Sequence, residues 1–415
     1  MAVDSIPQQA QEKIGHIDSA DVVVGILADL DHPDIASLCE SLQRLAGSPR
    51  LAVLQNEKGG HATPADSESA EKRAFPFLVS WPLLQLDPAG APVLNTFAAV
   101  QAVYAASEKL GARACCIVVS KLENASAGWI CELAKPMLER NIDLALPRYA
   151  PRKLEGLLNF SIIAPLMRSL YGKRIHNPMG PDLAVSQRLF RKMLVAGGNA
   201  RPKATHPLAS LVPEAASENL QVCEVHVGAR IYPPTDWTNI SSRIAQVLGP
   251  VFLDIERNAA FWQRMRGSVP VPSIGEPGLA PQDPGPLEIS RMIESFQLGN
   301  RDLQEIWGLV LPPSTLFELR KLARLAADQF HMPDELWARI VYDFALAHRL
   351  RTISRDHLLK SMTPLYLAWV ASYAQDMKND ADLTVDQRLE RLSAAYESCK
   401  SYFVARWRWP DRFNS

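Results

Sequence analysis

The side chains best suited to chemistry in this sequence follow a short apolar run near the end of its first third. Residues 115–119 (CCIVV) are wholly apolar and rich in β-branched side chains, which predicts a strand buried on both faces of a sheet. Ser120 and Lys121 come directly after it. In open α/β sheets, ligands bind outside the carboxyl ends of the strands. We therefore predict a ligand site at Ser120 and Lys121.

The elements around this run alternate between strands and helices. A helix is expected from about Ser126, with apolar side chains at Trp129 and Leu133, until Pro136 kinks or ends it. The same alternation extends over residues 20–267, and it favours an α/β domain built mostly on a parallel sheet.

Other parts of the chain differ in composition. Residues 1–19 are polar and aperiodic, which indicates a flexible arm. Residues 268–286 hold six prolines and three glycines, which is typical of a semi-extended linker. Residues 287–415 show only helical patterns and predict an all-α domain, with a capping box formed by Thr315 and Glu318.

Length, charge and composition narrow the class of protein. A chain of 415 residues is too long for one ordinary core, so we expect two domains. The formal net charge of −1 gives no bulk electrostatic argument for nucleic acid or for an anionic membrane. No apolar run is long enough to span a membrane, and the N-terminus lacks the apolar core of a signal peptide.

The cysteines and histidines indicate no metal or disulfide framework. The six cysteines show no CxxC spacing and several lie in apolar segments, which is typical of reduced thiols in a cytoplasmic protein. The nine histidines form no HxxxH or HExxH pair, so the sequence does not support a zinc site. GxGxxG, GxxxxGK[ST] and GxSxG motifs are also absent from the sequence.

Three longer segments resemble a known family. These are WICELAKPMLERNIDLALPRY (129–149), LYGKRIHNPMGPDLAVS (170–186) and QVLGPVFLDIERNAAFWQRMRGSVPVP (246–272). Their order and spacing resemble retaining GT-A glycosyltransferases of the glucosyl-3-phosphoglycerate synthase and mannosylglycerate synthase type. The resemblance implies a GT-A fold, which is a Rossmann-like, mostly parallel sheet that binds nucleotide diphospho-sugars, followed by an all-α C-terminal domain.

The resemblance also shows where this chain departs from the family. Family members carry a DXD motif, whose aspartates hold a divalent cation, at the position of Val119, Ser120 and Lys121. A further metal ligand, a histidine, corresponds to Tyr232. Hard cations need oxygen ligands, so the resemblance predicts no bound metal. Lys121 can then either replace the cation beside the donor diphosphate or be a solvated lysine at an inactive site, and both interpretations stay open.

The same resemblance assigns donor and acceptor residues. For the nucleotide-sugar donor it points to the ends of the first two strands, at Ala28, Asp29, Asn56, Glu57 and Lys58. For the acceptor and the transfer centre it points to Tyr149, Arg152, Lys153, Gly180 and Asp182. Two basic residues beside a tyrosine would suit a small carboxylate or phosphate. The alternatives are turn-capping carboxylates for Asp29 and Glu57 and a solvated basic turn for Arg152 and Lys153.

These observations lead to one functional hypothesis and one alternative. The hypothesis is a cytoplasmic hexosyltransferase that moves a hexose from a UDP-, GDP- or ADP-sugar to a small polar, glycerate-like acceptor, without a divalent metal and with retention of configuration. The alternative is a catalytically inactive GT-A-like protein that binds a sugar nucleotide or a partner subunit. No nucleic-acid partner is expected. A homodimer is compatible with the aromatic C-terminal helices, whose tryptophans and tyrosines are expected in the core or at a dimer contact.

Overall fold

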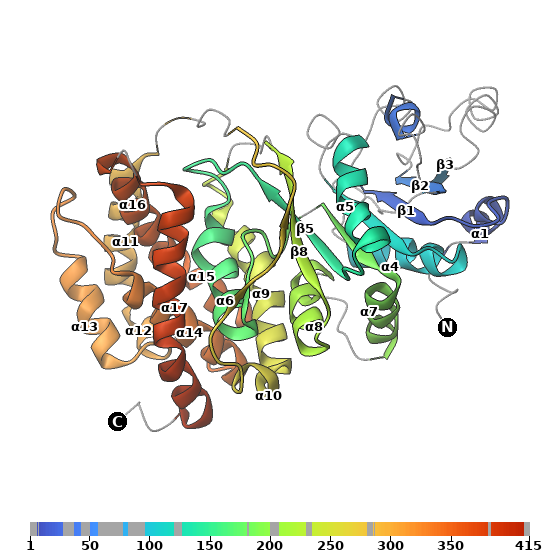
Figure 1. The fold of residues 1–415 in the computed structure, drawn as a ribbon. Coiled ribbons are helices and arrows are strands. Elements are labelled where there is room, and N and C mark those ends of the chain that lie inside the picture. Colours follow the sequence, from blue (N-terminus) through green and yellow to red (C-terminus); the bar gives the residue numbers. More distant parts are fainter. Residues whose placement is uncertain are drawn as a thin grey trace. The chain divides into compact units, whose positions relative to one another are not determined.

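The chain forms two compact units, each assembled from separate segments (Figure 1). The computed structural model describes residues 6, 8–27, 37–42, 50–56, 78–81, 96–119, 127–180, 182–199, 207–229, 235–279, 285, 287–380 and 383–410. The first unit comprises Met1–Tyr149, Met179–Arg230 and Val271–Gly278. The second comprises Ala150–Pro178, Ile231–Pro270 and Leu279–Ser415.

The first unit is built on an eight-stranded sheet. Its strands are β1 (Val22–Ile26), β2 (Leu51–Asn56), β3 (Leu78–Trp81), β4 (Ala114–Val118), β5 (Leu144–Tyr149), β7 (Leu183–Ser186), β8 (Val222–Gly228) and β10 (Ser273–Ile274). They lie in the order β10-β8-β5-β7-β4-β1-β2-β3. In this sheet β7 runs antiparallel to both of its neighbours, and every other pairing is parallel.

Helices cover both faces of this sheet, because the central strands are apolar on both sides. On one face, Val22, Val24 and Ile26 of β1 join a core with α5 (Ala127–Glu139) and the helical residues 37–42. On the other face, Gly25 meets Val103 of α4 (Thr96–Lys109) so closely that a Cβ on the glycine would lie 2.6 Å from a valine methyl.

A further helix packs on the α4 side of the sheet. Gln101 of α4 donates to the carbonyl of Met193 in α7 (Gln187–Asn199) at 3.4 Å, and Tyr104 stacks on Phe190 with centroids 6.1 Å apart. The unit also holds α1 (Gln8–Ile14), the 3-10 helix Pro207–Ser210 and α8 (Leu211–Ser217). The result is the helix–sheet–helix layering expected of a mostly parallel sheet.

The second unit is helical apart from one two-stranded ladder between β6 (Lys173–Arg174) and β9 (Val269–Pro270). Its helices are the π-helix Asn159–Ile163, α6 (Ala164–Tyr171), α9 (Ile240–Arg257), α10 (Ala259–Trp262), α11 (Ile289–Asp302), α12 (Gln304–Gly308), α13 (Pro313–Leu322), α14 (Asp334–Leu350), α15 (Arg355–Ser361), α16 (Thr363–Asn379) and α17 (Val385–Arg408). None of the helices in the described part of the chain has the length and apolar character needed to cross a bilayer.

The π-helix has a packing role in this unit. The carbonyl of Ser161 accepts hydrogen bonds from Trp337 Nε1 at 2.9 Å and from Tyr396 Oη at 2.8 Å. These donors come from α14 and α17, so a segment from the middle of the chain is bonded to helices near its end. A π-bulge displaces carbonyls from the regular α-helical ladder, which makes one available to two buried aromatic donors.

The fold class predicted from the sequence is confirmed: a mostly parallel α/β unit and a helical C-terminal part. The compact units do not follow the contiguous domains expected at 20–267 and 287–415. Residues 150–178 and 231–270 pack with the C-terminal helices instead. The reason is that each segment contains a helix, α6 or α9, whose apolar side chains are buried.

Three local expectations are corrected. The arm predicted over 1–19 contains α1, whose Ile14 is fully buried. The linker predicted over 268–286 contains β9 and β10, the second of which extends the large sheet. Thr315 and Glu318 form no capping box, because α13 begins at Pro313; the capping box of this unit lies at Thr384 and Gln387, at the start of α17.

Candidate active site

The carboxyl ends of the parallel strands lie along one edge of the sheet, and the strand order reverses beside β1. The chain runs from β1 outward through β2 to β3, and then returns to place β4 on the other side of β1. In doubly wound sheets the crevice for a ligand opens where the order reverses. Here that position lies between the ends of β1 and β4, which are joined by a hydrogen bond from Leu27 N to Val118 O of 2.8 Å.

Asp182 is a charged side chain that the fold brings to this edge. It directly precedes β7, which runs antiparallel between β4 and β5, so the start of β7 lies at the ends of its two neighbours. The backbone N–H of Val119, just after β4, donates to Oδ1 of Asp182 at 3.0 Å. The hydroxyl of Tyr149, the last residue of β5, donates to Oδ2 at 2.8 Å.

Both oxygens of the Asp182 carboxylate are therefore held by donors from neighbouring strands. The side chain is only 2% exposed, and buried carboxylates of this kind need such donors because desolvation is otherwise costly. The two bonds fix the direction in which the negative charge faces. A fixed carboxylate at the carboxyl ends of the strands can stabilise positive charge that develops on a bound substrate.

Trp129 packs against Tyr149, the tyrosine that bonds to Asp182. Its ring lies 6.0 Å from that of Tyr149, at an interplanar angle of 50°. Its indole nitrogen lies beside Gly228, the last residue of β8, where an added Cβ would come within 3.8 Å. Gly228 has a φ of +83°, which an L side chain rarely adopts. Trp129 thus fills the space between the ends of β5 and β8.

The residues that follow β10 pack against the carboxyl end of β8. Gly278 approaches Gly228 so closely that a Cβ on Gly278 would lie 2.8 Å from the Gly228 Cα. Gly275, with a φ of +84°, lies against the backbone of His226. Two backbones can approach this closely only where there is no side chain, so these positions after β10 require glycine. The segment after β10 therefore forms a wall of the site in the first unit.

The buried thiols of β4 have no part in this chemistry. Burial raises the pKa of Cys115 to about 12, and burial also raises that of Cys116 well above its ordinary value. A thiol is nucleophilic only as the thiolate, so both cysteines serve as small core residues. None of the six cysteines is part of a disulfide bond.

The structure describes some of the residues that the sequence assigned to the site. Several lie outside the described residues: Ala28, Asp29, Glu57, Lys58, Ser120, Lys121 and Tyr232. Asn56 ends β2, on the carboxyl edge of the sheet as expected. Gly180 is buried, two residues before Asp182. Asp182 and Tyr149 are brought together by a direct hydrogen bond.

Arg152 and Lys153, the basic residues expected at the acceptor, follow Tyr149 by three and four residues in the chain. They belong to the helical unit, whereas Tyr149 belongs to the sheet unit. Arg152 is no solvated basic turn, because its Nη1 lies 2.6 Å from Glu155 and its side chain is only 12% exposed. The carbonyl of Lys153 accepts from the Tyr373 hydroxyl at 2.6 Å. The guanidinium of Arg152 is thus already paired with a carboxylate.

Among the positions where the family resemblance would place metal ligands, Val119 is the one that the structure describes, and it does not fit a divalent cation. Val119, at the first position of the expected DXD motif, has a hydrocarbon side chain that offers no ligand atom, and its backbone N–H is used by Asp182. Within the described ranges no three His, Cys, Asp or Glu side chains group as a metal site requires.

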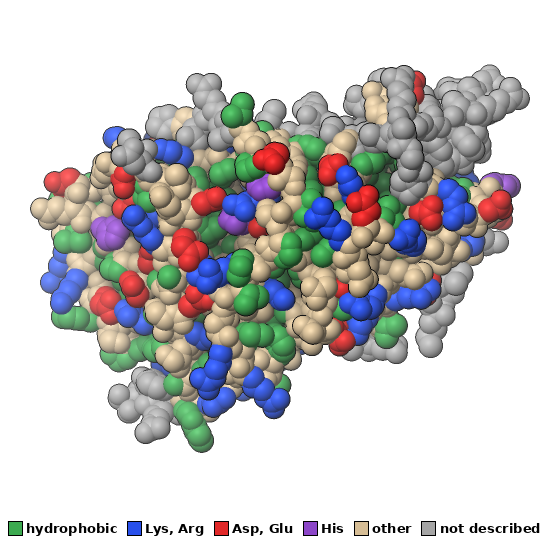
Figure 2. All heavy atoms as spheres, in the orientation of Figure 1, with side chains coloured by type: hydrophobic (Ala, Val, Ile, Leu, Met, Phe, Trp, Pro, Cys, Tyr) green, Lys and Arg blue, Asp and Glu red, His purple; other side chains and the backbone are tan. Residues whose placement is uncertain are grey.

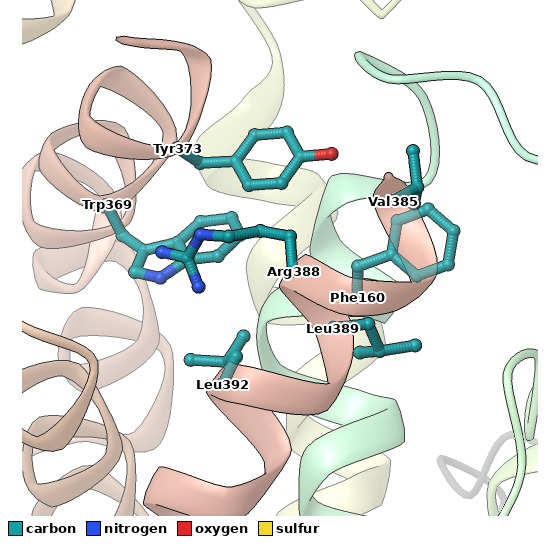
Figure 3. Close-up of a pocket in the computed structure, with 7 residues that line it drawn as sticks. All are labelled: Phe160, Trp369, Tyr373, Val385, Arg388, Leu389 and Leu392. Carbon is teal, nitrogen blue, oxygen red and sulfur yellow. The ribbon is translucent and has the colours of Figure 1, made fainter. Parts of the chain in front are cut away.

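A separate hollow lies in the helical unit and is lined by aromatic and aliphatic side chains (Figure 3). Arg388 reaches into it, with its guanidinium 6.0 Å from the Trp369 ring centroid and 5.9 Å from that of Tyr373. The cavity volume is about 10 Å³, far below the range typical of small-molecule sites. The Arg388 charge is neutralised by Asp334 at 2.7 Å and Asp376 at 3.2 Å. These features indicate a structural ion-pair network.

The sequence missed two features that build the site. The first is β7, because Leu183–Ser186 is too short to show a period. The second is the full length of β5, which continues through Pro147 to Tyr149. The proline is tolerated because β5 pairs with β7 only at Leu144 and Ala145, which leaves the ladder beyond without that neighbour.

Comparison with known proteins gives weak similarities. No family model and no curated protein matches the chain. Among solved structures, glucosyl-3-phosphoglycerate synthase from Mycobacterium tuberculosis in complex with Mn²⁺, UDP-glucose and phosphoglyceric acid is similar, with 16% identity, a TM-score of 0.39 and coverage of 60% of this chain and 84% of that one. The same enzyme in complex with Mg²⁺ and UDP is similar with 16% identity, a TM-score of 0.38 and coverage of 60% of this chain and 83% of that one.

A third solved structure, a mycobacterial protein, gives 19% identity, a TM-score of 0.38 and coverage of 59% and 78%. Values this low do not assign the chain to a family.

Proposed function

We propose that this protein is a cytoplasmic GT-A-type glycosyltransferase that uses a nucleotide diphosphate hexose as donor. The observation that carries the proposal is the reversal of strand order between β1 and β4, with Asp182 fixed at the same edge by Val119 and Tyr149. A crevice of this kind suits a dinucleotide or diphosphate ligand. The sequence resemblance described above supports the choice of a sugar nucleotide within that class.

The donor would lie across the ends of β1, β2 and β4. In this proposal Ala28, Asp29, Asn56, Glu57 and Lys58 contact the nucleoside, and Ser120 and Lys121 face the diphosphate. The ammonium group of Lys121 would offset the charge of the leaving diphosphate, which is the contribution a divalent cation makes in related chemistry. Metal independence follows from this assignment and is part of the proposal.

Asp182 would act at the transfer centre as a fixed negative charge. Transfer of a hexose passes through a transition state with positive charge on the sugar ring. A carboxylate held by Val119 and Tyr149 needs no reorganisation to face that charge. Retention of the anomeric configuration and a small polar, glycerate-like acceptor near Gly180 are proposed from the sequence resemblance, with Tyr149 positioning Asp182 as well as bordering the acceptor.

Two assays test the proposal. Turnover of UDP-, GDP- and ADP-glucose and -mannose with glycerate or phosphoglycerate is measured in EDTA and in added Mn²⁺. The proposal predicts turnover that persists in EDTA. Turnover that requires added metal would refute the lysine assignment, and nucleotide binding without turnover under any condition would favour the alternative, a catalytically inactive sugar-nucleotide-binding protein.

A further inference from the structure

Three arginine-rich segments, far apart in the sequence, meet at one end of the helical unit. They are residues 256–266, 348–355 and 405–409. Arg349 Nη1 donates to the carbonyl of Trp407 at 2.8 Å, which joins the second and third segments. Arg408 Nε donates to Gln263 Oε1 at 2.7 Å, which joins the third to the first.

The first and second segments are joined as well. Arg355 Nη2 donates to Glu256 at 3.0 Å, and the Phe252 ring lies 5.7 Å from the imidazole of His348. Trp262 stacks on Phe403 with centroids 4.8 Å apart. The ends of α9, α10, α14 and α17 therefore form one fixed surface, at the lower edge of Figure 2, where Lys and Arg side chains gather.

The charge of this surface is strongly positive. Five of its arginines are exposed: Arg257, Arg264, Arg266, Arg351 and Arg408. The acids in and next to these segments are already paired with basic side chains. Glu256 pairs with Arg355, and Asp356 pairs with Lys360 at 2.8 Å. Burial lowers the pKa of His348 to about 4, and the nearby Arg355 and Arg351 add to that shift, in keeping with a positive local potential.

Exposed apolar side chains lie among these arginines. Leu350, the last residue of α14, is 43% exposed, and Trp409, just after α17, is 63% exposed. Cations near helix C-termini are common because they complement the helix dipole, which accounts for arginines such as Arg408. It does not account for Arg264 and Arg266, which follow α10 in a turn, or for the exposed leucine and tryptophan.

We propose that this surface docks peripherally on an anionic phospholipid bilayer. Arginines provide the attraction to lipid phosphates, at about fivefold in binding per residue near the surface. Tryptophan and leucine can enter the boundary between head groups and acyl chains. Nucleic acid also offers phosphates to the arginines, but it has no apolar phase into which Leu350 could insert. The bilayer is therefore the partner that fits both the arginines and the exposed apolar side chains. The inference is independent of the proposed transferase function.

The test is sedimentation of the full-length protein with vesicles. Vesicles of phosphatidylcholine mixed with phosphatidylglycerol are compared with vesicles of phosphatidylcholine alone, at low and at high salt. We expect binding to the anionic vesicles that weakens as salt screens the charges. Arg264→Glu/Arg266→Glu should lower the partition at least about tenfold, and Trp409→Ala should lower it severalfold.

A matched variant controls for net charge. Arg320→Glu/Arg324→Glu reverses two exposed arginines of the same unit outside the patch and should bind like the wild type. Circular dichroism and thermal unfolding confirm that all variants fold. Equal binding to neutral and anionic vesicles, or equal losses in both double variants, would overturn the proposal. So would binding of a DNA or RNA duplex through Arg264 and Arg266 without vesicle binding.

Discussion

The Tyr149 hydroxyl donates to the Asp182 carboxylate at 2.8 Å, and this bond joins the end of one parallel strand to the start of the antiparallel strand beside it. The other carboxylate oxygen takes the N–H of Val119, at the end of β4. One buried aspartate thus ties three strand ends at the edge where the strand order reverses. The position of that charge is set by the sheet itself.

Tyr149→Phe should weaken both the fold and the site. It removes a hydrogen bond to a buried charge, which costs about 1–3 kcal/mol of unfolding free energy, and it lets the carboxylate turn. Urea unfolding and turnover of the full chain measure the two effects. Tyr171→Phe is the matched control, because the Tyr171 hydroxyl also donates to a buried aspartate, Asp254, at 3.2 Å in the helical unit. Loss of turnover in the control alone would contradict the assignment.

Asp182→Asn should keep the shape of the side chain and remove its charge. We expect activity to fall by about 10²-fold or more, because a preorganised charge is lost. Asp143→Asn is the control: Asp143 is also buried and accepts from Ser186 at 2.8 Å and from Gln221 N at 2.9 Å, at the opposite edge of the sheet. Activity per folded molecule should survive in the control. Full activity in Asp182→Asn would remove Asp182 from the transfer centre.

Gly25→Ala should destabilise the sheet unit through overpacking. The new methyl group would meet Val103 Cγ2 at 2.6 Å and Cγ1 at 2.7 Å, in a core where neither group can move freely. Such overpacking costs about 1–3 kcal/mol. Adding Val103→Ala should restore part of the loss, and a double-mutant cycle on denaturant unfolding measures it. Additive effects of the two substitutions would show that the contact does not control the packing.

The pH dependence of stability should include a contribution from His331. A hydrogen bond to Asp376 raises the pKa of His331 above its ordinary 6.5. A raised folded-state pKa means that the stabilisation is fully present below the unfolded pKa and is lost as pH rises through the folded pKa. His331 is 57% exposed, so the contribution should stay below about 1 kcal/mol.

The measurement for His331 is the Tm of wild type and His331→Asn from about pH 5 to about pH 9. The Tm of the wild type should be higher than that of the variant at acidic pH, and the two Tm values should converge above the folded-state pKa of His331. A difference that is constant with pH would show that the imidazole contributes by packing alone.

Much of the fold could be predicted from the sequence because its strongest patterns are local. The mostly apolar runs at 21–27 and 51–55 predict strands, and so does the stretch 222–227, where Glu224 and His226 alternate with apolar residues. They are β1, β2 and β8, with ends shifted by one residue at most. The helix expected near residue 126 is α5, which ends three residues beyond Pro136. Burial on both faces leaves such runs little freedom to be anything else.

The site could be predicted only in part, because it depends on pairings that no local pattern records. The sequence placed Asp182 and Tyr149 near the site as separate residues. Their direct bond follows from β7, a four-residue strand whose insertion between β4 and β5 is set by long-range pairing. The arginine surface could not be predicted either, because its three segments are about fifty or more residues apart in the sequence. The net charge of the whole chain gives no sign of a local positive surface.

The central claim is that a nucleoside diphosphate binds at the ends of β1 and β4, with Lys121 in place of a cation. Calorimetric titration with UDP, GDP and ADP in EDTA tests it most directly, on wild type, Lys121→Ala and the control Lys135→Ala, which changes an exposed lysine of α5. The account predicts that one of the three nucleotides binds wild type and control equally, and Lys121→Ala at least about tenfold more weakly. No binding by any nucleotide, binding that appears only with added Mn²⁺, or an unchanged Kd in Lys121→Ala would contradict it.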